Sequence, residues 1–314
     1  MKKLLSLLLI LTLAFAFTAC GEETPDADNT VTRIGYFAGT TGIGMAGMLA
    51  NEEGKYEFKK YDGPTFITAA LAKGDIDIAA LPTNAVPNFY KNSNGSVQLL
   101  AINTLGVLHV CTNGTTVSTL SDLEGKTVYV PEQAPKLVLE YILREAGVNA
   151  TVSLEYNLDL LPGAIAQGTV DVAVLPEPKV TVAQNMSKQV EGSAFAVSID
   201  LTYEWNKVCD TDLVQGCVVV RKAFATEHPA AVESFLSDYS KSISYVQNPA
   251  NLDAVAAAVV EAGILPNAVV AKSAIPRSNI TYMDGADMKA AAEGFYGALG
   301  MALPEDAFYY IPQN

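Results

Sequence analysis

The stretch Leu71–Asn84, LAKGDIDIAALPTN, decides the fold of this chain. Its first residues predict the end of a helix at Gly74, because glycine readily takes the left-handed conformation that ends helices. The apolar residues within 76–81 then predict a short buried strand that closes at Pro82. The next two residues, Thr83-Asn84, are of types that favour the start of a helix. The stretch therefore predicts helix, turn, strand and helix in succession, as in an α/β sheet.

The same pattern returns in Ala164–Pro178, AIAQGTVDVAVLPEP, at an offset of 94 residues (168 − 74). Two copies at one offset predict two similar α/β halves, and chance agreement between two ordinary βα units is the alternative. Each copy ends in a loop at the carboxyl end of a strand, where open α/β sheets bind ligands. The matching positions are Gly74 and Gly168, Asp77 and Asp171, and Leu81-Pro82 and Leu175-Pro176.

The first 30 residues predict export and attachment to a membrane. Two lysines precede the apolar run Leu4–Phe17, which is shorter than the about 20 residues that cross a bilayer, so residues 1–19 are predicted to be a signal peptide. Phe17–Cys20 resembles a bacterial lipobox, which implies cleavage before Cys20 and a lipid on its thiol; a plain secretory signal is the alternative. Residues 20–30 are acidic and polar and predict a solvated tether. The mature protein is therefore expected outside the cytoplasm, anchored to the cell membrane.

Composition limits the remaining classes of function. A chain of 314 residues is long enough for two domains, and its net charge of −14 argues against nucleic acid as a partner. Three cysteines follow the lipobox, and an odd number cannot all pair within one chain. Cys111 and Cys217 lie in apolar strands and are most simply buried thiols, while a Cys209–Cys217 disulfide is the alternative. We expect a monomer.

The halves are predicted from two apolar, β-branched segments, Leu105–Thr112 and Gln215–Arg221, that cross from one half to the other and back. The first lobe is expected to comprise residues 31–107 and 222–314, and the second residues 108–221. The helices predicted after the return crossing are expected to pack on the first lobe.

A glycine-rich turn, Gly39–Gly44, follows the first predicted strand. It lacks the Gly-Lys-Ser/Thr of a nucleotide-binding P-loop, and its spacing is not that of a dinucleotide fingerprint. Its backbone N–H groups and two hydroxyls at a helix start could hold an anion or a ligand carbonyl. The simpler alternative is a flexible turn with a capping threonine.

A family resemblance is plainest in Leu120–Val130, LSDLEGKTVYV, which is similar to the start of the second lobe in type II periplasmic solute-binding proteins. Within them, the chain resembles the branch of nitrate, sulfonate, taurine and thiamine-precursor binding proteins of ABC importers. Thr40 stands where proline is common in the family, and residues 131–135 replace a more glycine-rich turn, so the resemblance specifies no ligand. Further matches, in family order, are Gly35–Phe37, Gly42–Met45, Asp77–Asn84, Leu175–Pro178, Asp200–Thr202, Glu204-Trp205 and Gly216–Lys222.

This resemblance implies an α/β, periplasmic-binding-protein-like II fold, with two lobes joined by two crossings and a ligand cleft between them. It implies hinge closure on a small sulfonate-, nitrate-, taurine- or pyrimidine-like solute and delivery to an ABC permease and its ATPase. No cofactor is expected. The turns expected to line the cleft supply Thr40, Thr41, Gly42, Ile43, Thr83, Asn84, Asn103, Thr104, Gln133, Ala134, Glu177 and Pro178.

Several single residues leave alternatives open. Glu177 would favour an amine or a protonated heterocycle at the cleft, or would act only as a charge at a helix start. Trp205, the only tryptophan, covers the cleft or fills the core. His109 and Cys111 share a strand face, but two ligands are too few for a metal site, so a partly buried neutral histidine is the better interpretation.

Two rival functions remain at the level of sequence. Related folds host enzymes of pyrimidine and menaquinone pathways, but the chain shows no Ser-His-Asp or Cys-His arrangement, so no catalytic residue is assigned. The other rival is a solute receptor that presents its ligand to a membrane sensor, which sequence does not separate from transport.

Overall fold

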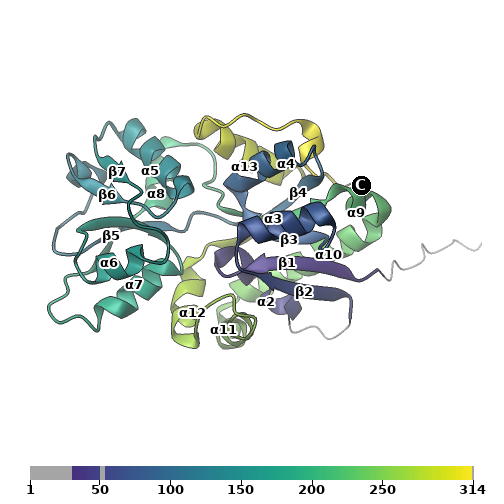
Figure 1. The fold of residues 1–314 in the computed structure, drawn as a ribbon, viewed down its shortest axis with the longest axis horizontal. Coiled ribbons are helices and arrows are strands. Elements are labelled where there is room, and N and C mark those ends of the chain that lie inside the picture. The colour runs from purple at the N-terminus through teal and green to yellow at the C-terminus, as the bar shows by residue number, and fades with distance from the viewer. Residues whose placement is uncertain (1–29, 50–53, 313–314) are drawn as a thin grey trace, which may run out of the picture.

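The computed structural model describes residues 30–49 and 54–312, which form two α/β lobes lying side by side (Figure 1). The predicted signal peptide, Cys20 and all of the predicted tether except Thr30 lie outside the described residues. Among the helices that are described, none combines the length and the apolar character needed to cross a membrane.

The first lobe is built on a six-stranded mixed sheet in the order β11-β4-β10-β3-β1-β2. Its strands are β1 (Thr32–Phe37), β2 (Tyr56–Tyr61), β3 (Ile78–Pro82), β4 (Val97–Thr104), β10 (Gly216–Arg221) and β11 (Ile280–Asp284). Its α-helices are α2 (Ala46–Leu49), α3 (Pro64–Lys73), α4 (Val86–Asn92), α9 (Lys222–Glu227), α10 (Pro229–Gln247), α11 (Leu252–Glu261), α12 (Ala268–Ala274) and α13 (Gly285–Ala298).

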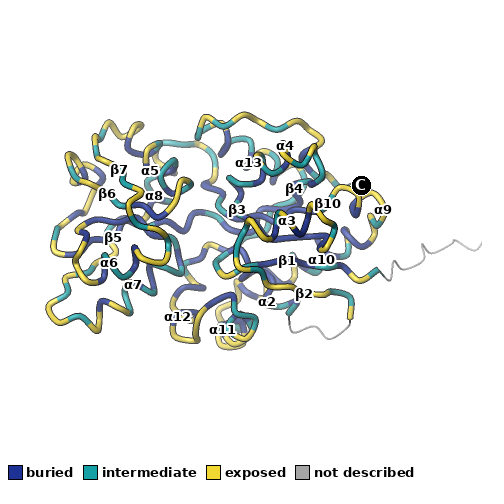
Figure 2. Tube along the Cα trace, in the orientation of Figure 1, coloured by how far each residue is buried: buried dark blue, intermediate teal, exposed yellow. Residues whose placement is uncertain are grey.

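Helices cover both faces of this sheet, so its central strands are apolar on both sides. Ala79 and Leu81 of β3 belong to the core that includes α3, α4 and α13. Ile78 and Ala80 belong to the core that includes α2, α10 and α11. The helices predicted after the return crossing therefore pack on the first lobe, and Figure 2 shows its central strands as buried.

The second lobe has a five-stranded sheet in the order β7-β6-β8-β5-β9. Its strands are β5 (Leu108–Thr112), β6 (Thr127–Tyr129), β7 (Thr151–Ser153), β8 (Val172–Pro176) and β9 (Ala196–Asp200). Its helices are α5 (Gln133–Ala146), α6 (Leu161–Ala166), α7 (Lys179–Ser187) and α8 (Leu201–Val208). The two mixed sheets confirm the predicted α/β two-lobed fold class.

The repeated sequence pattern corresponds to a repeated structure. The helices α3 and α6 are each followed closely by a glycine with positive φ, 76° at Gly74 and 73° at Gly168. The strands β3 and β8 that come next have the same length and the same burial pattern, with four buried residues and a half-buried proline. The expectation of two similar α/β halves is therefore correct.

One predicted boundary is wrong. The second lobe was expected to run to residue 221, but β10 pairs antiparallel with β3 and β4 in the middle of the first sheet. Its residues Cys217–Val220 are fully buried, which suits a central strand with helices on both faces. The crossings are therefore residues 105–107 and 209–215, and the chain has already returned to the first lobe at Gly216.

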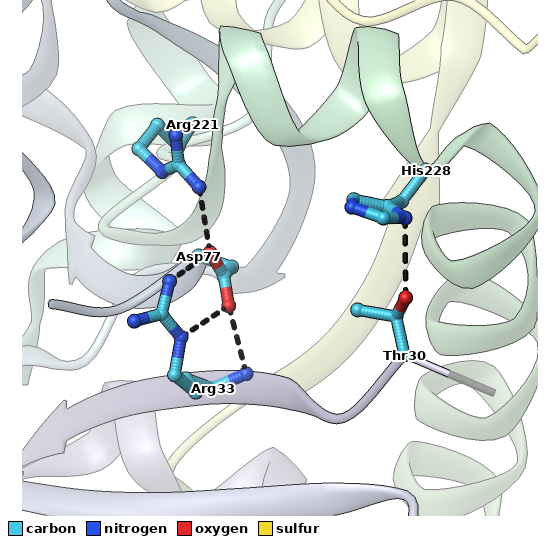
Figure 3. A network of polar contacts seen from close by, with 5 residues as sticks. All are labelled: Thr30, Arg33, Asp77, Arg221 and His228. Atoms are coloured by element: carbon cyan, nitrogen blue, oxygen red, sulfur yellow. Dashed lines mark hydrogen bonds and ion pairs between the residues drawn. The ribbon is translucent and has the colours of Figure 1, made fainter. Parts of the chain in front are cut away.

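The two copies of the repeat differ at one buried charge, and Figure 3 shows it in the first copy, at Asp77. Asp77 is 1% exposed, and its carboxylate accepts hydrogen bonds from Arg33 Nε (2.8 Å), Arg33 Nη2 (2.7 Å) and Arg221 Nη2 (2.9 Å). Its counterpart Asp171 is exposed. The Asp77 network joins β1, the segment before β3 and the end of β10, three parts of the chain that are far apart in sequence. In the same view, Thr30 Oγ1 lies 3.2 Å from His228 Nδ1 and ties the start of the described chain to α10.

An apolar contact joins the lobes behind the cleft. Trp205 of α8 is fully buried, with its ring centroid 4.8 Å from that of Tyr141 in α5 and 6.0 Å from that of Phe295 in α13. Its Nε1 donates to the carbonyl of Thr211 in the return crossing (2.6 Å). Gly294 of α13 faces the Thr211 side chain so closely that a Cβ would collide with it. Trp205 therefore fills the core.

Candidate ligand-binding site between the lobes

The two repeated strand-to-helix turns meet at one cavity. The last residue of each strand, Pro82 of β3 and Pro176 of β8, lines a cavity of about 350 Å³ between the lobes, here called the inner cavity. Asn84 and Glu177, which follow these strands, line it too. The carboxyl ends of strands are where open α/β sheets present ligand-binding loops. Its lining residues are Phe37, Thr40, Thr41, Pro64, Pro82, Asn84, Ala85, Val107, Leu108, Glu132, Gln133, Ala134, Pro135, Pro176, Glu177 and Gln215.

The first lobe contributes hydroxyl and amide groups. The glycine-rich turn forms a 3-10 helix, Thr40–Met45, that begins at the cavity. Thr41 is only 6% exposed, and its Oγ1 has no hydrogen-bond partner among the described residues. Because buried hydroxyls are nearly always paired, this one is suited to a ligand atom. Asn84 lies in the second short 3-10 helix, Thr83–Ala85, and is half-buried.

The second lobe contributes the start of α5. Gln133 and Ala134 are its first two residues, and Glu132 precedes them at the N-cap without a capping hydrogen bond from its side chain. The Glu132 side chain is exposed to the cleft. Although Glu132 keeps contact with solvent, the surrounding protein removes part of its hydration and raises its pKa. The charge of Asp159 adds to this rise, and the charge of Lys179 opposes it.

Glu177 forms a bridge between the lobes. Its side chain is fully buried, and its Oε1 lies 2.8 Å from Arg277 Nε of the first lobe. Its Oε2 accepts from Thr181 Oγ1 (2.8 Å), and Arg277 Nη2 also donates to that hydroxyl (2.6 Å). Burial raises the pKa of Glu177, and the hydrogen bond from Thr181 and the charge of Arg277 oppose this. Its carboxylate is already held by Arg277 and Thr181, and it also serves as an acceptor in the first turn of α7.

The crossings form the floor of the inner cavity. Gln215 of the return crossing accepts from the backbone N–H of Val107 in the first crossing (2.6 Å) through its side-chain oxygen. Its own N–H donates to the carbonyl of Thr104 (2.9 Å). A further link comes from Asn279, whose side chain donates to the carbonyl of Gly106. Side-chain and backbone hydrogen bonds thus join the two crossings to each other and to the first lobe.

A second cavity of about 720 Å³, here called the outer cavity, continues from the first and shares Phe37, Pro64, Pro82 and Glu132 with it. Its charged lining residues are Lys60, Asp62, Glu132, Asp159 and Lys179. Lys179 is paired with Asp159 at 3.0 Å. The predicted residue Pro178 lines this cavity.

The structure brings together seven of the twelve residues predicted for the cleft. Five line neither cavity. Ile43 is fully buried in the core of the first lobe, and a Cβ on Gly42 would meet Ile264. The remaining ones are Thr83, Asn103 and Thr104.

Those last three residues support the site from behind. Asn103 Nδ2 donates to the carbonyl of Thr41 (3.0 Å) and to Tyr239 Oη (2.9 Å), while its Oδ1 accepts from Thr104 Oγ1 (2.9 Å). Thr83 is fully buried, and its carbonyl accepts from Tyr296 (3.1 Å). Their amide and hydroxyl groups are of the types that contact ligands, but the end of β4 and the start of the β3 turn point them into the protein.

Sequence reasoning missed Glu132, Phe37 and Gln215. Glu132 stands in the turn that departs from the family pattern and directly precedes two predicted residues, so the departure itself was the available signal. Phe37 is the last residue of β1 and resembles an ordinary core aromatic in sequence. Gln215 was recognised only as part of a crossing.

No group of three histidine, cysteine or acidic residues is placed to hold a metal ion within residues 30–49 and 54–312. His109 is half-buried, and burial lowers its pKa, so it is neutral near pH 7. Cys111, Cys209 and Cys217 are free thiols, so the structure does not contain the alternative disulfide.

Comparisons with known proteins agree with this architecture. A structure described as an ABC transporter from Parabacteroides distasonis matches with a TM-score of 0.72 and 22% identity, covering 90% of this chain and 99% of that one. The periplasmic aliphatic sulphonate binding protein SsuA from Escherichia coli matches with a TM-score of 0.68 and 18% identity, covering 90% and 92%. The periplasmic nitrate-binding protein NrtA from Synechocystis gives 0.61 and 12%, covering 86% and 81%. At these identities, the likeness shows a shared fold.

Sequence comparison gives the family. A Brucella abortus protein named as a binding protein is 25% identical over 179 residues, covering 54% of this chain and 55% of the relative. The chain thus spans about half the length of the curated relatives it matches. These relatives are binding proteins and not enzymes. The model of the family described as NMT1/THI5 like matches residues 57–251, which is more than half of the chain. The chain therefore belongs to the NMT1/THI5-like family.

Proposed function

We propose that this protein is the substrate-binding component of an ABC import system and captures one small solute in the inner cavity. The observation that carries this proposal is a cavity of about 350 Å³ lined by strand-end turns from both lobes. Its volume lies at the small end of the range for ligand pockets, about 300 to 1,000 Å³. A solute held by Thr41 and Asn84 on one side and by Gln133 on the other would connect the lobes.

Closure follows from this arrangement by population shift. A solute that contacts only one lobe gains nothing from closure, whereas one that bridges both gains contacts available only in the closed state. The two crossings are short, so the lobes can rotate about them while each sheet stays intact. The relatives named for sulphonate and nitrate support a solute of similar size.

A lipid on Cys20 would keep the protein beside the membrane permease to which the closed form delivers its solute. The permease and its ATPase are implied by the family. Replacing Cys20 by Ser is expected to move the protein from the membrane fraction to the soluble exported fraction, because the anchor is lost while the folded lobes are unchanged. Fractionation and immunoblotting measure this. A variant that stays in the membrane fraction would show that another segment holds it there.

The unpaired hydroxyl of Thr41 gives a direct test of the cleft. A thermal-shift screen against sulfonates, nitrate, amino acids, amines and pyrimidines should yield a solute that raises the melting temperature with concentration. Replacing Thr41 by Val is expected to weaken that solute about 10-fold, through loss of about one hydrogen bond. Stability should stay within about 1 kcal/mol, because the hydroxyl has no partner without ligand. Asn84→Ala should also weaken binding.

Asn103 is the matched control for this test. Replacing it by Ala removes hydrogen bonds to Thr41 and Tyr239 and should cost about 1 to 3 kcal/mol of folding free energy. Isothermal titration and urea unfolding separate the two effects. Full affinity in both the Thr41 and the Asn84 variants would remove the cavity from the proposal.

A further inference from the structure

The inner cavity has an unusual balance of charge for a family with anion-binding relatives. Its lining contains no lysine, arginine or histidine, and its only charged residues are Glu132 and Glu177. Glu177 is neutralised by Arg277 at 2.8 Å. The free charge facing the cavity is therefore that of Glu132, and it is negative.

Within the described residues, no other protein group binds the Glu132 carboxylate. Its side chain makes no capping hydrogen bond to α5, and no ion pair holds it within the described part of the chain. The cation whose charge acts on it is Lys179, which is itself paired with Asp159 at 3.0 Å. Burial and the charge of Asp159 raise the pKa of Glu132, so the ionised form gains from any cation placed beside it.

The start of α5 does not restore an anion site. A helix N-terminus carries about half a positive charge and favours anions. Here Glu132 places a full negative charge at that same point, beside Gln133. The outer cavity adds two lysines, Lys60 and Lys179, and two aspartates, Asp62 and Asp159, whose charges balance. The unbalanced charge along the approach is therefore again that of Glu132, which lines both cavities. An anion would enter against this field and against the −14 charge of the chain.

Thr41 supplies the second observation. Thr41 lines the same cavity from the opposite lobe, and its buried Oγ1 has no hydrogen-bond partner among the described residues. An N–H group of a ligand can donate to this oxygen while a second N–H reaches the carboxylate of Glu132. Ammonium, amidinium and protonated heterocycles carry the positive charge and the several N–H donors that this pair of acceptors requires.

We propose that the ligand is a small solute bearing a protonated nitrogen, held between Glu132 of the second lobe and Thr41 of the first. This inference rests on the proposed solute-binding function. It distinguishes this protein from the relatives named for sulphonate and nitrate, because those names describe anions.

Titration of the purified protein with solutes sorted by charge tests the inference. The cations are benzamidine, 4-aminopyridine and ethylammonium, and the anions are benzenesulfonate, ethanesulfonate and nitrate. We expect binding from the cation set only. Replacing Glu132 by Gln keeps the size of the side chain and should weaken the bound cation about 10- to 100-fold.

The matched control is Glu140→Gln, which makes the same change at an exposed carboxylate of the same helix, α5, outside both cavities, and should change affinity by less than about twofold. Binding of an anion between the lobes, or full cation affinity in Glu132→Gln, would overturn the inference and leave the proposed function standing. Failure of every probe to bind or to stabilise the wild-type protein would count against both.

Discussion

Replacing Asp77 by Ala is expected to lower the free energy of unfolding by about 3 kcal/mol. The Asp77 carboxylate is 1% exposed and accepts hydrogen bonds from Arg33 and Arg221, so its removal leaves two guanidinium groups without their common partner. Breaking a fully buried pair costs about 3 to 5 kcal/mol. The lower end applies here because the side chains of Arg33 and Arg221 stay 36% and 22% exposed and can be hydrated.

The effect depends on pH in a defined direction. Burial alone would raise the pKa of Asp77, but the hydrogen bonds from Arg33 and Arg221 outweigh it and lower the pKa below its ordinary value of 3.8. The contribution of Asp77 to stability is therefore fully present above about pH 4 and is lost as the pH falls through the folded-state pKa. Wild type and variant should differ at pH 7 and converge in strong acid.

Asp171 is the control that the chain itself provides. It occupies the same position of the repeat in the second lobe but is exposed, so Asp171→Ala should change stability by less than about 0.5 kcal/mol. Urea unfolding at pH 7 compares the two variants. Equal losses would show that the Asp77 network adds no stability beyond that of an exposed aspartate.

Replacing Trp205 by Ala is expected to cost about 3 to 5 kcal/mol. The side chain is fully buried, contacts Tyr141 and Phe295 in different lobes, and donates a hydrogen bond to the return crossing. Its loss leaves a cavity at the contact between the lobes and an unpaired carbonyl at Thr211. We expect the free energy of unfolding to fall in urea titrations followed by circular dichroism.

Tyr203 lies two residues away on the same helix and is 64% exposed. Tyr203→Ala removes an exposed aromatic ring that makes a cation–π contact with Lys207. This loss should cost less than about 1 kcal/mol. A Trp205 variant as stable as the Tyr203 variant would contradict the assignment of Trp205 to the core.

Much of the fold could be predicted from sequence because the repeat carries local signals. Gly74 and Gly168 mark helix ends by backbone conformation, and the apolar runs before Pro82 and Pro176 mark buried strands. The position of β10 could not be predicted in this way. Its apolar, β-branched residues indicate a buried strand but do not say which of two sheets it joins.

The candidate site, too, could be predicted from sequence only in part. Sequence placed Thr41, Asn84 and Gln133 at the cleft because turns after strands face it. It did not separate them from Ile43 and Asn103, since the direction of a side chain in a turn depends on tertiary packing. The partner of Glu177 is 100 residues away, at Arg277, so sequence could not show that this carboxylate is already paired.

Closure of the lobes on a solute is the central claim, and a distance between the two rims tests it most directly. Phe66 in α3 and Leu160 beside α6 are 58% and 62% exposed and lie near residues that line the outer cavity. Spin labels on Phe66→Cys and Leu160→Cys, with Cys209→Ser to remove the half-buried thiol, report that distance by pulsed electron resonance. With the solute that gives the largest thermal shift, the account predicts a shorter and narrower distance distribution. A saturated protein with an unchanged distribution would contradict it.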